Sequence, residues 1–181
     1  EAYERKANQV VLEEHDAAAR IAAHGRNRLV ITGGEPLLQG AALARMLAEL
    51  PDLHVEIETN GTVPVHPALD PLVNQFNVSP KLAHSGNAPE LALVPERLAR
   101  WAADPRAAFK FVVADPGDLD EIAALQRRFA IPAARVWLMP EGRDSATLRS
   151  RAAWLAPLCA AHEFNFSDRL HIHLHGDTRG T

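Results

Sequence analysis

Apolar and polar positions alternate in blocks along the chain. Six short apolar runs predict strands near residues 28–31, 54–58, 75–78, 109–113, 135–139 and 169–174, the last reading "RLHIHL". Amphipathic or Ala/Leu-rich segments between them predict helices from Asn8 to a stop at Gly25 and near 39–50, 67–73, 95–103, 119–129 and 145–161. Strands separated by helices in this way indicate a parallel sheet with helical crossovers.

Two architectures fit this pattern, an open doubly wound sheet and a barrel. About six strands are too few for a complete eight-stranded barrel. The sequence shows no internal repeat, low-complexity tract or linker that would divide it. We therefore expect a single α/β domain over residues 1–181.

Composition narrows the class of ligand. The 181 residues are 47% hydrophobic and 23% charged, as expected of a globular domain, and the formal net charge is -4. This balance gives no electrostatic footprint for a nucleic-acid backbone or an anionic membrane, and it favours a small-molecule ligand. No apolar run approaches the roughly 20 residues of a membrane span, and no secretory signal is evident, so we expect a cytoplasmic protein.

A single cysteine, Cys159, limits the metal and redox chemistry of the sequence. One thiol excludes an intrachain disulfide framework and any cluster or zinc site built from several thiolates of this chain. Cys159 lies in "AAWLAPLCAAH", a helical stretch where a lone thiol is expected to be buried and inert.

The loops that follow the strands hold the candidate chemistry, because parallel sheets place ligands at the carboxyl ends of their strands. In "ITGGEPLLQ", Gly33 and Gly34 can expose backbone groups to a ligand, and Pro36 suits a first helical turn. The Glu35 carboxylate beside this backbone suits a ligand with an ammonium group. An alternative interpretation makes Glu35 a first-turn acid that complements the helix dipole.

This loop resembles the Gly-Gly-Glu motif of radical S-adenosylmethionine enzymes. With "IETNGT", "NVSPKLAHSGN", "WLMPEG" and "SDRLHIHLHGDTRGT", in that order and spacing, the chain from about residue 28 resembles the 7-carboxy-7-deazaguanine synthases of queuosine and 7-deazapurine biosynthesis. Of these motifs, the segment "SPK" placed after "ETNG" is the one specific to this family. The resemblance implies an incomplete parallel α/β barrel, in agreement with the strand count.

The resemblance also implies a ligand for each loop. It assigns the methionyl amino group of S-adenosylmethionine to the Gly-Gly-Glu loop, its carboxylate and ribose to the loop after 75–78, and its adenine to the segment after 135–139. The implied cofactor-binding residues are Gly33, Gly34, Glu35, Ser79, Pro80, Lys81, Met139, Pro140, Glu141 and Gly142. Thr32 and the carboxylate of Thr181 are implied to contact the pterin substrate.

The implied reaction is the ring contraction of 6-carboxy-5,6,7,8-tetrahydropterin to 7-carboxy-7-deazaguanine, which releases ammonia and uses Mg²⁺. It begins when a reduced [4Fe-4S] cluster cleaves S-adenosylmethionine to a radical that removes a substrate hydrogen. The family further implies a carbon-nitrogen lyase that acts as a homodimer and receives its electron from a donor such as flavodoxin.

The sequence departs from the family in one respect. The three cysteines that hold the cluster are expected after a first barrel strand, upstream of the predicted helix at Asn8, and they are absent. Either the sequence is N-terminally incomplete or it is a homologue that lost the cluster. The start at Glu1, the missing first strand and the preserved loops favour the first explanation.

Two other functions remain open at this stage. His171, His173 and His175 would share one face of a strand, and with Asp177 they could serve a metal-dependent hydrolase. Alternatively, a cluster-less relative could bind S-adenosylmethionine or a purine-like or pterin ligand without catalysis. Lys110, between two phenylalanines, points either into the barrel or to an exposed edge.

Overall fold

A curved sheet of parallel strands organises the chain. The computed structural model describes residues 10–88 and 92–178. Its strands are β1 (Arg28–Ile31), β2 (His54–Thr59), β3 (Gln75–Val78), β4 (Ala107–Val113), β5 (Val136–Pro140) and β6 (Asn165–Phe166). They pair in sequence order, all parallel, and β6 does not return to β1. The sheet is therefore an open, partial barrel, as predicted.

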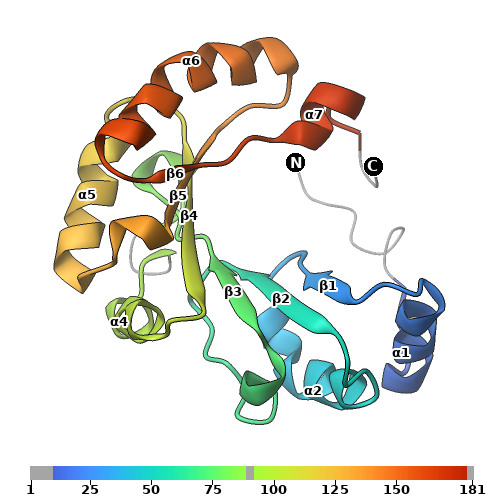
Figure 1. Cartoon of the computed structure of the whole chain (residues 1–181). Coiled ribbons are helices and arrows are strands. Elements are labelled where there is room, and N and C mark those ends of the chain that lie inside the picture. The colour runs from blue at the N-terminus through green and yellow to red at the C-terminus, as the bar shows by residue number, and fades with distance from the viewer. Residues whose placement is uncertain (1–9, 89–91, 179–181) are drawn as a thin grey trace.

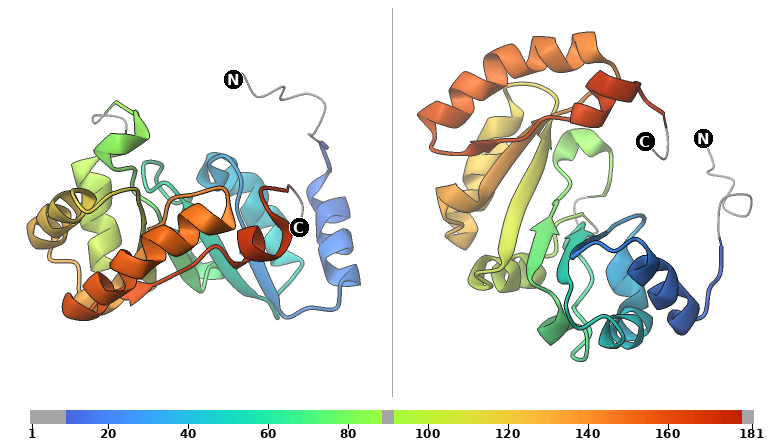
Figure 2. Two further views of the ribbon diagram at one scale, coloured as in Figure 1. Left: turned by 90° about the horizontal axis from the view of Figure 1, so that it is seen from above. Right: turned by 45° about the vertical axis from the view of Figure 1, so that its right-hand side comes forward.

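Helices cover the outside of this arc (Figures 1 and 2). They are α1 (Glu14–Ala23), α2 (Gly40–Ala48), α4 (Pro95–Ala103), α5 (Asp118–Phe129) and α6 (Ser145–Ala161), and the short α7 (Leu170–His175) follows β6. A 3₁₀ turn, Pro36–Gln39, precedes α2. Within the described part of the chain, no helix combines the length and apolar character needed to cross a membrane.

Strand alternation separates an apolar outer face from a polar inner face. In β4, Phe109, Phe111 and Val113 are fully buried against the helices, while the intervening residues are half-buried. On the outer side Trp101 of α4 packs on Phe76, with ring centroids 4.9 Å apart. Burial of this outer face supplies the main favourable free energy of folding, and it leaves the inner face available for chemistry.

The predicted strand at 169–174 is wrong. The chain pairs with β5 only at Asn165 and Phe166, and the backbone then turns and forms α7. Six residues that alternate in polarity do not distinguish a strand from a short helix. In the helix only Ile172 is buried, while Leu170 and Leu174 are each 65% exposed.

Two predicted helices are shorter than expected. The segment predicted as a helix at 67–73 forms only a 3₁₀ turn at Asp70–Leu72, because Pro71 removes a backbone donor there. The helix predicted from Asn8 begins at Glu14 within the described residues. The remaining helices lie within a few residues of their predicted bounds.

Candidate functional site

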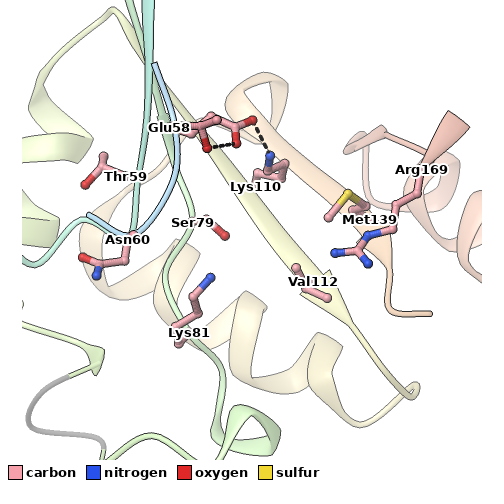
Figure 3. Close-up of a pocket in the computed structure, with 11 residues that line it drawn as sticks. Glu58, Thr59, Asn60, Ser79, Lys81, Lys110, Val112, Met139 and Arg169 are labelled. Atoms are coloured by element: carbon pink, nitrogen blue, oxygen red, sulfur yellow. Dashed lines mark hydrogen bonds and ion pairs between the residues drawn. The ribbon is translucent and has the colours of Figure 1, made fainter. Parts of the chain in front are cut away.

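The loops that follow β1, β2, β3 and β6 meet residues near the ends of β2, β4 and β5 in one cavity of about 260 Å³ at the carboxyl ends of the sheet (Figure 3). It is lined by Thr32, Gly34, Glu58, Thr59, Asn60, Ser79, Lys81, Lys110, Val112, Met139 and Arg169. Five of these residues, Thr32, Gly34, Ser79, Lys81 and Met139, belong to the site predicted from the sequence. Their convergence follows from the topology, because parallel neighbouring strands end at the same edge.

The Gly-Gly-Glu loop owes its shape to backbone conformation. Gly33 and Gly34 have φ angles of 95° and 54°, a region that residues with a Cβ rarely adopt. No atom lies within 4 Å of a Cβ built at either position, so conformation rather than crowding requires glycine. Gly34 thereby lies on the cavity wall with its backbone uncovered.

Glu35 ties this loop to the end of β2. Its Oε1 accepts hydrogen bonds from the Leu37 backbone N–H at 3.1 Å and from the Thr59 hydroxyl at 2.8 Å. Its Oε2 accepts one from the Asn60 backbone N–H at 2.8 Å. The carboxylate thus caps the helical turn that begins at Pro36, one position before the first turn in which the alternative interpretation placed it. The ammonium-binding role of Glu35 stays a prediction.

An ion pair crosses the inner face beside the cavity. Lys110 Nζ lies 2.9 Å from Glu58 Oε1, and the Thr32 hydroxyl donates to Glu58 Oε2 at 3.0 Å. Burial raises the pKa of Glu58, but the hydrogen bond and the charge of Lys110 outweigh it and hold this pKa below its ordinary value. Of its two predicted directions, Lys110 therefore takes the inward one (Figure 3).

Lys81 enters the cavity from the loop after β3. Burial, and then the charge of Lys110, lowers the pKa of Lys81. Its ammonium makes no hydrogen bond or ion pair with the residues that the structure describes. Pro80 is buried next to Lys81 and lines a smaller adjoining cavity with His84. Ser79 and Lys81 can therefore reach a ligand directly, whereas Pro80 shapes the wall behind them.

The end of β5 contributes one side chain to the cavity, and the residues that follow it contact neighbouring elements. Met139 lines the cavity, whereas Pro140, Glu141 and Gly142 do not. Glu141 instead forms an ion pair with Arg151 of α6. The carbonyl oxygen of Gly142 accepts a hydrogen bond from Arg169 Nη1 at 2.9 Å.

Sequence reasoning missed several cavity residues, namely Glu58, Thr59, Asn60, Val112 and Arg169. Glu58 and Thr59 end β2 and Asn60 follows it, so their position at a strand end was the available signal. Arg169 gave none, because it was placed inside a strand that does not form. Predicted substrate contact Thr181 lies outside the described residues.

The histidines near the C-terminus do not form the expected row. On α7 consecutive histidines of this set are about 200° apart around the helix axis, so His173 lies on the side opposite to His171 and His175. His173 bonds to Ser145 Oγ at 2.9 Å and to Asp168 at 3.1 Å, which ties α7 to the start of α6. Among the described residues no group of three or more His, Cys, Asp or Glu side chains converges. The hydrolase alternative therefore loses its structural basis.

Cys159 is 2% exposed in α6, where burial raises the pKa of its thiol. It belongs to the hydrophobic core and does not line the cavity. This confirms the inert interpretation and means that the residues of this chain do not supply thiolate ligands for an iron-sulfur cluster at the site.

Solved structures identify the class of fold. QueE from Escherichia coli superposes with a TM-score of 0.61 at 26% identity, over 86% of this chain and 63% of that one. SuiB from Streptococcus suis, solved bound to S-adenosylmethionine, gives 0.59 at 14% identity over 90% of this chain and 42% of that one, which shows the fold alone. The open parallel sheet is thus a partial barrel of the radical S-adenosylmethionine type.

Curated relatives identify the family within this class, although no family model matches the chain. A 7-carboxy-7-deazaguanine synthase from Pyrobaculum aerophilum is 36% identical over 172 residues, which cover 92% of this chain and 73% of the relative. One from Halobacterium salinarum is 34% identical over 180 residues, 86% of this chain and 67% of the relative. The chain belongs to the 7-carboxy-7-deazaguanine synthase family of enzymes, and this confirms the resemblance seen in the sequence.

Proposed function

We propose that the chain binds S-adenosylmethionine and 6-carboxy-5,6,7,8-tetrahydropterin in this cavity and serves the ring contraction to 7-carboxy-7-deazaguanine, with loss of ammonia. The observation that supports the proposal is the convergence on one cavity of Gly34 from the loop after β1, Ser79 and Lys81 from the loop after β3, and Met139 from β5, in a member of this family. Gly34 offers bare backbone, Lys81 a cation and Met139 an apolar surface. These groups match the ammonium, carboxylate and adenine of the cofactor.

Each residue has a binding role in this proposal. The Gly34 backbone carbonyl and the Glu35 carboxylate orient the ammonium, and Ser79 and Lys81 hold the carboxylate and ribose. Met139 covers the adenine, while the backbone of Pro140, Glu141 and Gly142 frames it. Thr32, beside Glu58, faces the substrate. When bound, S-adenosylmethionine supplies the radical that starts the reaction.

The structure gives no ligands for the [4Fe-4S] cluster, since Cys159 is the only cysteine of the sequence and lies in the core. We therefore derive no step through the cluster from these residues. The Mg²⁺ requirement, the homodimer, the flavodoxin-like electron donor, the cytoplasmic localisation and the absence of nucleic-acid and membrane partners stay predictions.

Two measurements test the proposal. Calorimetry with the purified chain is expected to show S-adenosylmethionine binding, and absence of binding would contradict the proposal. In a bacterial strain that lacks its own synthase, expression of the gene that encodes this chain is expected to restore queuosine in tRNA. Binding without restored queuosine would favour the alternative of a non-catalytic binding protein.

A further inference from the structure

The charges around the cavity do not balance. Three cations, Lys81, Lys110 and Arg169, line it with one carboxylate, Glu58. Lys110 is paired with Glu58 at 2.9 Å. Within residues 10–88 and 92–178, neither Lys81 nor Arg169 makes an ion pair. Two cations thus face the cavity without a carboxylate partner from this part of the chain, which is suited to a ligand with negative charge.

Arg169 has an unused hydrogen-bonding edge. Its Nη1 donates to the Gly142 carbonyl, and this contact orients the guanidinium toward the cavity beside Met139 (Figure 3). Its Nε is buried and has no hydrogen-bond partner among the described residues. A buried donor without a partner is costly, so native structures retain few of them.

This edge matches a particular chemical group. With Nη1 occupied, the guanidinium keeps Nε–H and Nη2–H side by side, and that pair binds both oxygens of a carboxylate. Because Nε is shielded by protein atoms, contact with both nitrogens requires the Arg169 side chain to rotate so that Nε faces the cavity. A lysine at this position could not make the same planar, two-point contact.

Position decides which carboxylate Arg169 meets. Lys81 and Arg169 lie on opposite walls of the cavity, with the Glu58–Lys110 pair above them (Figure 3). The proposed reaction brings two carboxylates into this space, one on the cofactor and one on the pterin. Since Ser79 and Lys81 are the proposed partners of the cofactor carboxylate, the second carboxylate, that of the substrate, is the one that remains for Arg169.

We propose that Arg169 is a specificity-determining residue that binds the carboxylate of the pterin substrate and selects it over pterins without that group. This inference rests on the proposed function. It goes beyond it by assigning a recognition role to a residue that the sequence had not marked.

The test compares matched ligands. Pterin fluorescence reports the binding of 6-carboxypterin and of unsubstituted pterin to the wild-type chain and to Arg169→Gln and Arg169→Lys. Calorimetry reports S-adenosylmethionine and its decarboxylated analogue. Arg143→Gln is the control, because Arg143 is 81% exposed, is 3.9 Å from Asp177 and does not line the cavity.

Arg169→Gln is expected to weaken 6-carboxypterin about ten- to a hundredfold, the range for a charge-assisted contact, and to leave pterin unchanged. Arg169→Lys should lie between wild type and Arg169→Gln, and Arg143→Gln should change neither ligand. Unsubstituted pterin serves as the internal reference for a damaged fold, because an unfolded variant would lose both ligands.

Four results would overturn the inference. Equal loss of both pterins would make Arg169 a structural residue. Loss of S-adenosylmethionine with the decarboxylated analogue unchanged would assign Arg169 to the cofactor. If the wild-type chain bound neither pterin, the substrate of the proposed function would itself be wrong. If the wild-type chain bound 6-carboxypterin and Arg169→Gln bound it equally well, only the role of Arg169 would be refuted.

Discussion

Removal of the Glu35 carboxylate should destabilise the fold before any ligand is considered. Glu35→Ala deletes the acceptor of three hydrogen bonds, two of them from backbone N–H groups of Leu37 and Asn60. Loss of a helix cap costs about 1 kcal/mol, and each hydrogen bond to a charged group contributes roughly 1.5–3 kcal/mol. Because Glu35 is half-buried and water replaces part of these contacts, we expect a loss of about 2–4 kcal/mol.

Urea unfolding followed by circular dichroism measures this loss. The loss of stability in Glu35→Gln should be intermediate. The side-chain carbonyl oxygen still accepts hydrogen bonds, but the NH₂ group now faces a donor of the protein and cannot accept from it. The control is Glu49→Ala, whose carboxylate bonds only the exposed His15 at 2.7 Å and should change stability by less than about 0.5 kcal/mol. If Glu35→Ala unfolded at the same urea concentration as Glu49→Ala, the tie between the two loops would be refuted.

Three further outcomes can be measured. Gly61→Ala should lower the free energy of unfolding by about 2–3 kcal/mol in urea, because Gly61 has φ of 82° and a Cβ would lie 2.8 Å from Val78; wild-type stability would contradict this. Lys81→Met should raise the melting temperature without ligand, since burial disfavours the Lys81 cation, and should reduce the shift that S-adenosylmethionine produces; a lower melting temperature would count against it. The hydrogen bond from Arg106 lowers the pKa of Asp104 from its ordinary value of 3.8. The ionised Asp104 therefore stabilises the fold fully above pH 3.8, and this stabilisation is lost as the pH falls through the lowered pKa. In Asp104→Asn the free energy of unfolding should therefore depend less on pH in the acid range. An unchanged pH dependence would refute the stabilising role of the Asp104–Arg106 hydrogen bond.

The alternation of apolar runs and helices predicted most of the fold because the outer face follows simple rules. In β4 and β5 every second residue packs on helices, so hydrophobicity alone located them. The helix predicted near 145–161 spans Ser145–Ala161, and in the structure Asp144 caps its start. By contrast, α7 is too short for periodicity to define, and its neighbour β6 has only two residues.

The cavity residues that were predicted lie at or just after the end of a strand. Loop position marked the segments of Gly34, Ser79 and Lys81 as candidates, and the resemblance to the family assigned these residues to the cofactor. Glu58 and Lys110 needed the register of three strands, since β3 separates β2 from β4 and the pair is 52 positions apart in sequence. Local sequence patterns do not predict a contact such as Lys110–Glu58, in which a long side chain reaches across an intervening strand.

The inner face of β2 shows how one strand serves both stability and ligand binding. Glu56 is 8% exposed, and its carboxylate accepts hydrogen bonds from Arg28 at 2.6 Å and from Asn77 at 3.0 Å. Burial raises the pKa of Glu56, but these partners outweigh it and lower that pKa overall, so the charge is satisfied within the protein. Two residues further on, Glu58 faces the cavity and neutralises Lys110 alone. The inner-face charges are therefore paired toward the start of the strand, whereas near its carboxyl end cations outnumber carboxylates. This is the end at which parallel barrels bind their ligands.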